Sequence, residues 1–134
     1  KQNQYVDAHA VTKGHGFQGA VRRHGVDLRS HKSEKKRRGN VLGSQTPGKI
    51  RWGMPMPGQH GLHTRTEYNK FILKISNNIK EINPKSGFHQ YGLIKNDYLL
   101  VKGSIPGAKK RLIVLTEPIR TKKILQTEIS FIKK

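Results

Sequence analysis

Residues 14–19 read Gly-His-Gly-Phe-Gln-Gly and combine three glycines with one histidine. Glycines allow positive φ angles and let a ligand approach the backbone closely. The spacing matches the G-x-G-x-x-G pattern with which a strand–helix turn binds the pyrophosphate of a dinucleotide. Arg22, Arg23 and Gly25 follow, however, where that fold needs an apolar helix, and no strand–helix–strand unit comes after. The stretch therefore does not predict a nucleotide cofactor.

Seven histidines are the other residues with chemical potential. An imidazole acts as a general acid or base near neutral pH, so an RNA-modifying or RNA-cleaving enzyme that uses His15, His24 or His63 is the alternative interpretation. His60 and His63 form the most closely spaced pair that could bind a metal, but no cysteine or neighbouring carboxylate completes a ligand set. We expect no catalytic residue, no metal site and no cofactor.

Basic residues dominate the middle of the chain. From Lys13 to Lys70 there are 13 Lys or Arg and three acidic residues, and residues 29–38 alone hold six Lys or Arg and one Glu. Few apolar side chains recur there with any period. A solvated charged surface is the usual explanation of such a run. Because acidic partners are scarce, we instead expect contact with the phosphates of a nucleic acid.

Trp52 lies between Arg51 and Gly53 and is followed by Met-Pro-Met-Pro-Gly. These neighbours show no apolar periodicity, so a place in an ordinary core is the weaker interpretation. We expect the indole to stack on a base or to wedge between RNA helices.

The composition of the whole chain agrees with a polyanionic partner. The 134 residues carry a formal charge of +19, with 27 Lys plus Arg and eight Asp plus Glu. No amphipathic helix or lipid anchor indicates a membrane surface. No apolar run approaches 18 residues, and the chain contains no cysteine. RNA is therefore the expected partner, and neither a membrane nor a small-molecule substrate is expected.

Short apolar runs bounded by turn residues predict strands at both ends of the chain. They cover residues 5–12, 71–75, 91–94, 98–103 and 111–115, and alternation at Ile129 and Phe131 slightly favours a further strand over a helix in residues 124–132. Their aromatic residues, Tyr5, Phe71, Tyr91 and Tyr98, are expected in the core. Closure hides the edges of such strands, so we predict a mainly β fold, a small closed β-barrel with a long basic internal extension. Residues 1–24 and 66–134 form the predicted barrel body, and residues 25–65 form the basic, Gly- and Pro-rich extension.

Several motifs together resemble one family. They are Asp7-x-x-Ala10-x-Thr12-x-Gly14-His15-Gly16-x-x-Gly19-x-x-x-Arg23, Arg65-Thr66-Glu67-Tyr68-Asn69-Lys70, Gly87-Phe88 with Tyr91-Gly92, Lys95-Asn96-Asp97-Tyr98, and Lys102-Gly103-Ser104-Ile105-Pro106-Gly107. The chain resembles the universal large-subunit ribosomal protein number three, the L-three family, in its archaeal and eukaryotic branch. The resemblance covers nearly the whole chain, and we expect the chain to be the part that follows the family's N-terminal portion.

The resemblance implies a structural, non-enzymatic protein of the large ribosomal subunit in the cytoplasm. It implies a barrel bound to ribosomal RNA beside neighbouring ribosomal proteins, a role in subunit assembly, and an extension directed towards the peptidyl-transferase centre with Trp52 near its tip. The predicted RNA-binding residues are Lys13, His15, Arg22, Arg23, Arg29, Lys32, Lys35, Lys36, Arg37, Arg38, Lys49, Arg51, Trp52, His60, His63 and Arg65.

Overall fold

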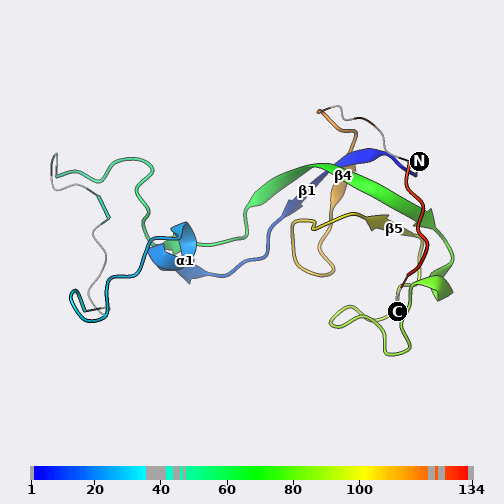
Figure 1. The fold of residues 1–134 in the computed structure, drawn as a ribbon, viewed down its shortest axis with the longest axis horizontal. Coiled ribbons are helices and arrows are strands. Elements are labelled where there is room, and N and C mark those ends of the chain that lie inside the picture. Colours follow the sequence, from blue (N-terminus) through cyan, green and yellow to red (C-terminus); the bar gives the residue numbers. More distant parts are fainter. Residues whose placement is uncertain are drawn as a thin grey trace. The chain divides into compact units, whose positions relative to one another are not determined.

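The chain divides into two compact units. A computed structural model describes residues 2–35, 42–43, 46, 48–120, 123 and 126–132 (Figure 1). The first unit, here the sheet unit, combines Lys1–Lys13 with His63–Lys134, and the second, here the inserted unit, is Gly14–Leu62. No helix in the described part of the chain is long and apolar enough to cross a membrane.

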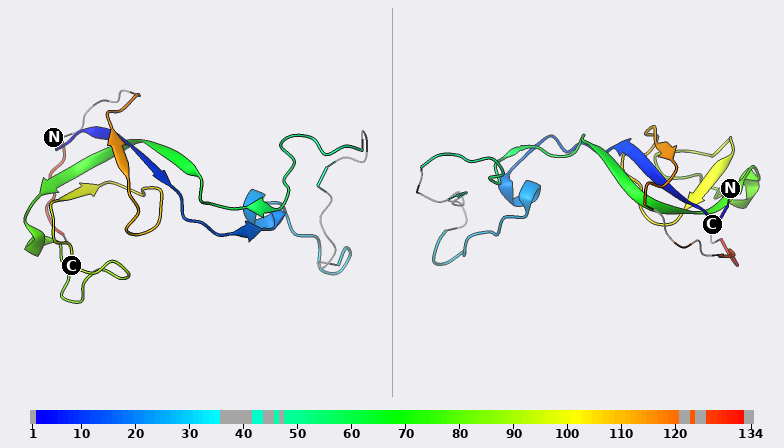
Figure 2. Two further views of the ribbon diagram at one scale, coloured as in Figure 1. Left: turned by 180° about the vertical axis from the view of Figure 1, so that it is seen from behind. Right: turned by 90° about the horizontal axis from the view of Figure 1, so that it is seen from above.

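The sheet unit is built on four antiparallel strands in the order β5-β4-β1-β6. The strands are β1 (Tyr5–Val11), β4 (Thr64–Ser76), β5 (Tyr98–Val101) and β6 (Val114–Thr116), and one 3-10 turn, η1 (Ile79–Glu81), follows β4. β1 and β4 run side by side in every view (Figure 2) and pair from Tyr5↔Phe71 to Val11↔Thr64. β1 and β4 are therefore the central strands, while β5 and β6 form the edges.

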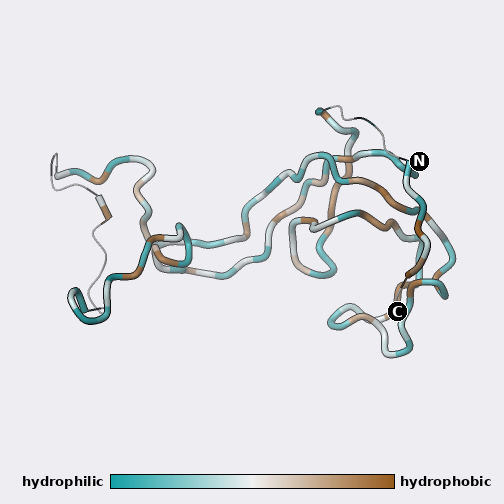
Figure 3. Tube along the Cα trace, in the orientation of Figure 1, coloured by the Kyte–Doolittle hydropathy of each residue, from teal (hydrophilic) through white to brown (hydrophobic). Residues whose placement is uncertain are grey.

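The buried side chains come from these strands. Val6, Ala8 and Ala10 alternate along β1, as expected for a strand with one buried face, and they share the core with Phe71, Ile72 and Tyr98. Hydrophobic colouring accordingly follows β4 and β5 in Figure 3. Tyr5 is half-buried and its ring lies 5.1 Å from that of Phe71. The prediction of Phe71 and Tyr98 as core residues is confirmed.

A β-bulge interrupts the ladder between β1 and β4. Val6 pairs with Lys70 but Ala8 pairs with Glu67, so two residues of β4 face Asp7 alone. One of them, Asn69, takes a positive φ of 55°. The fully buried Asp7 carboxylate accepts the Asn69 backbone N–H at 2.8 Å through Oδ1 and that of Ile119 at 3.0 Å through Oδ2. Asp7 thus fixes both the bulge and the segment that leaves β6.

These contacts also set the ionisation of Asp7. The backbone N–H groups of Ile119 and Asn69 hold the pKa of the carboxyl below its ordinary value, and the charges of His9 and Arg120 act in the same direction. Burial opposes the shift by disfavouring the charged form. The charged carboxylate is consequently the form that the fold stabilises.

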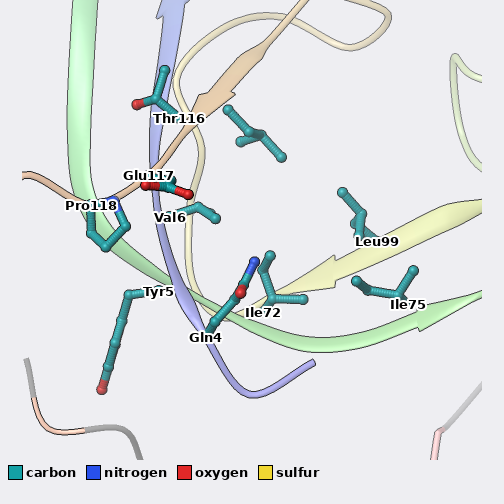
Figure 4. Close-up of a pocket in the computed structure, with 10 residues that line it drawn as sticks. Gln4, Tyr5, Val6, Ile72, Ile75, Leu99, Thr116, Glu117 and Pro118 are labelled. Carbon is teal, nitrogen blue, oxygen red and sulfur yellow. The ribbon is translucent and has the colours of Figure 1, made fainter. Parts of the chain in front are cut away.

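An apolar hollow of about 560 Å³ lies on the sheet (Figure 4). Val6, Ile72, Ile75 and Leu99 gather around it from β1, β4 and β5. The described residues do not close over this side of the sheet as a barrel, since the strand order leaves β5 and β6 at opposite edges. The mainly β prediction is confirmed. The closed barrel is not observed within the described residues, because four strands are too few to close around a filled interior.

The predicted strands at residues 5–12 and 98–103 coincide with β1 and β5, and residues 71–75 belong to the longer β4. The predicted strand at residues 111–115 overlaps β6 only at Val114 and Leu115. The predicted strand at residues 91–94 is wrong. A tight turn replaces it, because Gly87, Gln90 and Gly92 take positive φ angles and Phe88 bridges back to Gly92. The preferred strand in the tail is not observed at residues 126–132, where Phe131 is exposed and no neighbouring strand pairs with it.

The inserted unit has little regular structure and no described residue that is buried. Strand β2 (Phe17–Gln18) pairs with β3 (Gly58–Gln59), and the short helix α1 (Ala20–His24) ends at Gly25, which adopts the left-handed conformation. These elements come from both ends of the unit. The division into a barrel body and an extension with boundaries at residues 25 and 65 stays a prediction.

Replacing Asp7 by Asn should lower the stability of the sheet unit at pH 7. The asparagine side chain keeps one acceptor oxygen, but its NH2 group faces the other of the two backbone N–H groups, those of Asn69 and Ile119. That N–H group then lacks an acceptor. Because the folded-state pKa is lowered, the carboxylate's contribution is complete above its unfolded pKa, near 3.9, and is lost as pH falls through the folded-state pKa. Urea unfolding of the two proteins should therefore differ clearly at pH 7 and progressively less below about pH 4.

Asp97→Asn is the matched control, because the Asp97 side chain is exposed. Its unfolding midpoint should stay close to that of the wild type. Equal midpoints for Asp7→Asn and wild type at pH 7 would show that the buried carboxylate does not hold the bulge.

Candidate nucleic-acid interface

Most of the predicted RNA-binding side chains in the described residues are exposed. Those exposed are Lys13, His15, Arg22, Lys32, Lys35, Lys49, Arg51, Trp52, His63 and Arg65, while Arg23, Arg29 and His60 are half-buried. The inserted unit carries ten Lys or Arg and two acidic residues, Asp27 and Glu34. The ion pairs Lys70–Glu67 and Lys74–Glu81 lie in the sheet unit and involve no predicted RNA-binding residue. Most of the predicted cations thus present their charge to solvent.

Arg23 differs from the other predicted cations. Its Nη1 donates to the Met56 carbonyl at 2.8 Å and its Nε to the Gln59 carbonyl at 3.0 Å. The guanidinium also lies against the position that a side chain at Gly58 would occupy. Arg23 therefore ties α1 to the chain entering and leaving β3. Its neighbour Arg22 is exposed on the same helix.

His15 and His60 face each other next to the β2–β3 pair. The His15 N–H donates to the His60 carbonyl, the His60 N–H donates to the Gly16 carbonyl, both at 2.9 Å, and the ring centroids are 5.2 Å apart. Gly16 takes a φ of 69°, a conformation that favours glycine. The glycines at residues 14–19 hence shape a short β ribbon that presents two imidazoles, and not a phosphate-binding helix start.

Trp52 lies in a turn and has a relative exposure of 104%. The Met54 N–H donates to the Arg51 carbonyl at 3.4 Å, and Gly53 takes a φ of 87°. The indole therefore has its whole surface in solvent, and the interpretation of Trp52 as a core residue is wrong. A ring so exposed offers both faces to a planar partner.

The geometry around the histidines gives little support to the alternative interpretation as an RNA-modifying or RNA-cleaving enzyme. His24 Nε2 lies 3.2 Å from Arg23 Nη1, and His63 donates its backbone N–H to the Thr12 hydroxyl at 3.2 Å. Neither contact involves a carboxylate, and no group of histidines and carboxylates among the described residues could hold a metal ion. Lys36, Arg37 and Arg38 lie outside the described residues.

Comparison with known sequences decides the family. Residues 1–132 match the profile described as Ribosomal protein L3. The chain belongs to the ribosomal protein L3 family. The resemblance drawn from the motifs is thereby confirmed.

Several archaeal members of the ribosomal protein L3 family are named "Large ribosomal subunit protein uL3". The chain is 50% identical to that of Methanocorpusculum labreanum over 89% of its own length, 54% to that of Pyrobaculum calidifontis over 90%, and 49% to that of Methanocaldococcus jannaschii over 98%. It spans 37%, 36% and 41% of those relatives' lengths. These relatives carry the name of a ribosomal protein and not of an enzyme, in agreement with the non-enzymatic prediction.

Some exposed apolar residues of this L3-family chain escaped the sequence analysis. Phe17, Leu28 and Ile50 are exposed in the inserted unit, and Phe88 and Tyr91 in the sheet unit. Tyr91 is 46% exposed, so its prediction as a core residue is wrong. The signal was the run of glycines and turn residues around it, because a turn in residues 87–92 cannot bury every side chain that it carries.

Arg23→Gln and Arg22→Gln should separate structural from electrostatic roles. Both changes remove one charge from α1, but only Arg23 donates to backbone carbonyls in the structure. We expect Arg23→Gln to destabilise the β2–β3 pair locally by about 1 kcal/mol, the typical net contribution of one hydrogen bond, because the Arg23 side chain is only half-buried. Amide hydrogen exchange at His15 and His60 should then be about fivefold faster, while Arg22→Gln leaves it unchanged. Equal exchange in both variants would contradict the structural role of Arg23.

Proposed function

We propose that this chain is part of a structural constituent of the large ribosomal subunit that binds ribosomal RNA. The observation that carries the proposal is a unit with ten Lys or Arg, two acidic residues and no buried side chain among its described residues, in a chain of the ribosomal protein L3 family. Such a unit cannot obtain its stability from a hydrophobic core of its own. RNA phosphates supply the counter-charge and the packing surface that it lacks.

In this proposal the exposed cations contact phosphates, whereas Arg23 keeps the β2–β3 pair in shape. RNA is recognised through its backbone geometry more than through its base sequence. The basic, Gly- and Pro-rich segment around residues 25–65 is the extension, and it reaches towards the peptidyl-transferase centre with Trp52 near its tip. Ribosomal RNA and neighbouring ribosomal proteins are the partners, the location is the cytoplasmic ribosome, and the protein supports assembly of the subunit.

The sheet unit belongs, in the same proposal, to a closed β-barrel that anchors the protein. The apolar hollow on the sheet and the unpaired edges of β5 and β6 support this view, since exposed edges and apolar faces are normally covered. In this proposal further strands complete the barrel. The chain spans only about two-fifths of the length of its relatives.

RNA binding should depend strongly on salt. If six to ten phosphates are neutralised, a plot of log affinity against log salt concentration should have a slope of about −4 to −7, at roughly −0.7 for each contact. Combining Lys49→Gln with Arg51→Gln should make the slope shallower by about 1.4. Filter binding to a ribosomal RNA fragment at several salt concentrations measures this change.

The pair Lys80→Gln and Lys123→Gln removes the same charge from exposed residues outside the predicted set and should leave the slope unchanged. Equal flattening by both pairs would mean that total charge alone matters. A slope near zero for the wild type would overturn RNA binding itself.

Trp52→Ala should leave the overall affinity for RNA nearly unchanged, because stacking on one base contributes on the order of 1–3 kcal/mol beside many phosphate contacts. In assembled particles the change should disturb the placement of the extension. We expect slower tRNA accommodation and altered chemical probing of nucleotides at the catalytic centre. Normal assembly together with wild-type behaviour in both measurements would remove any role for the ring there.

A further inference from the structure

The turn at residues 87–92 presents a cluster of aromatic side chains that no contact described above uses. Phe88, His89 and Tyr91 stand within four residues, with Phe88 37% and Tyr91 46% exposed. Together with Ile94 and Lys109 they line an open recess of about 480 Å³ in the sheet unit. This volume falls in the range of roughly 300–1,000 Å³ that is typical of small-molecule sites.

The backbone holds this cluster in one conformation. Phe88 and Gly92 exchange backbone hydrogen bonds of 2.8 and 2.9 Å, and the Tyr91 N–H also donates to the Phe88 carbonyl. Asn83 closes the base of the loop, because its side chain donates to the Ile94 carbonyl at 2.9 Å and accepts the Ile94 N–H at 3.0 Å. The backbone that carries the rings therefore loses little conformational entropy when a partner docks.

Lys109 brings a positive charge to the recess. Its Nζ donates to the His89 carbonyl at 2.6 Å, which fixes the ammonium at the wall and leaves further N–H donors for a ligand. From Pro84 to Arg111 the sequence holds six Lys or Arg and one acidic residue, Asp97. Protein–protein interfaces are depleted in Lys at their centres, so this combination fits an anion that carries a planar ring better than it fits a protein surface.

We propose that this recess binds an unstacked nucleobase of RNA, with the rings of Phe88, His89 and Tyr91 contacting the base and Lys109 contacting an adjoining phosphate. Stacking on aromatic side chains beside a cation is the usual way in which proteins hold single-stranded nucleotides. The site lies in the sheet unit and uses none of the predicted RNA-binding residues. The proposal deepens the proposed RNA binding and rests on it.

Photo-cross-linking locates the base directly. The full chain is irradiated with a single-stranded oligo-uridine that contains 4-thiouridine and is then digested with trypsin. Cleavage after Lys85 and Lys95 releases residues 86–95 as one peptide that carries all three rings. We expect a nucleotide adduct on this peptide, identified by mass spectrometry.

Substitution at Tyr91 tests the role of its ring. Tyr91→Leu keeps an apolar side chain at this partly exposed position but removes the aromatic face, and should reduce the adduct and weaken oligo-uridine binding about two- to tenfold. Tyr91→Phe should behave like the wild type. Tyr68→Leu is the matched control, since Tyr68 is also partly exposed but the Arg120 guanidinium covers its ring at 4.4 Å, and it should change neither measurement.

The outcomes separate this inference from the proposed function. RNA bound with adducts on other peptides but none on residues 86–95 would overturn the base site and leave ribosomal RNA binding intact. Failure of the chain to bind RNA at all would overturn both. In assembled particles, Tyr91→p-benzoylphenylalanine should cross-link to RNA, whereas a cross-link to protein alone would assign the recess to a neighbouring protein.

Discussion

The sheet unit depends on the charge of one buried carboxylate. Asp7 sits where β4 contributes an extra residue opposite β1, and its two oxygens accept backbone N–H groups from Asn69 and Ile119. A bulge leaves backbone groups without ladder partners, and burying them unpaired is costly. The side chain supplies those partners and so lets β1 serve as a central strand between β4 and β6. The order of the sheet and the hollow beside it follow from that central pairing.

The inserted unit obeys a different constraint. Its cations repel one another, and its described residues bury no apolar side chain that would offset the repulsion. Local devices maintain the structure that it has, namely the Arg23 contacts to Met56 and Gln59 and the paired backbone of His15 and His60. In the proposed function, a polyanionic surface is thus a structural requirement of such a unit as well as its ligand. The exposed indole of Trp52 fits the same view, because a ring in water gains most from a partner that covers it.

Sequence reasoning succeeded where a residue pattern has one physical meaning. Alternation of Val6, Ala8 and Ala10 predicts a strand with one buried face, and the family motifs led to the correct family.

Sequence reasoning failed where backbone geometry decides the structure. Nothing local in the sequence indicates that Asn69 forms a bulge. The glycines at 87 and 92 do indicate a turn, but the apolar run at residues 91–94 was given more weight, so Tyr91 was placed in the core. Likewise, a list of basic residues does not distinguish Arg23, which binds its own backbone, from Arg22, which faces solvent. Closure of a barrel depends on more strands than the four of this sheet.

The hydrogen bond from Ile119 to Asp7 joins residues 112 positions apart. During synthesis from the N-terminus, Asp7 leaves the ribosome long before its second donor has been made. Oδ2 of Asp7 must therefore stay hydrated until Ile119 has emerged, even if Asn69 already binds Oδ1. Long-range closure of this kind slows folding and prolongs the exposure of unpaired strand edges. Until Ile119 has emerged, the basic residues between it and Asp7 therefore belong to a nascent segment whose sheet is incomplete and which other molecules can reach.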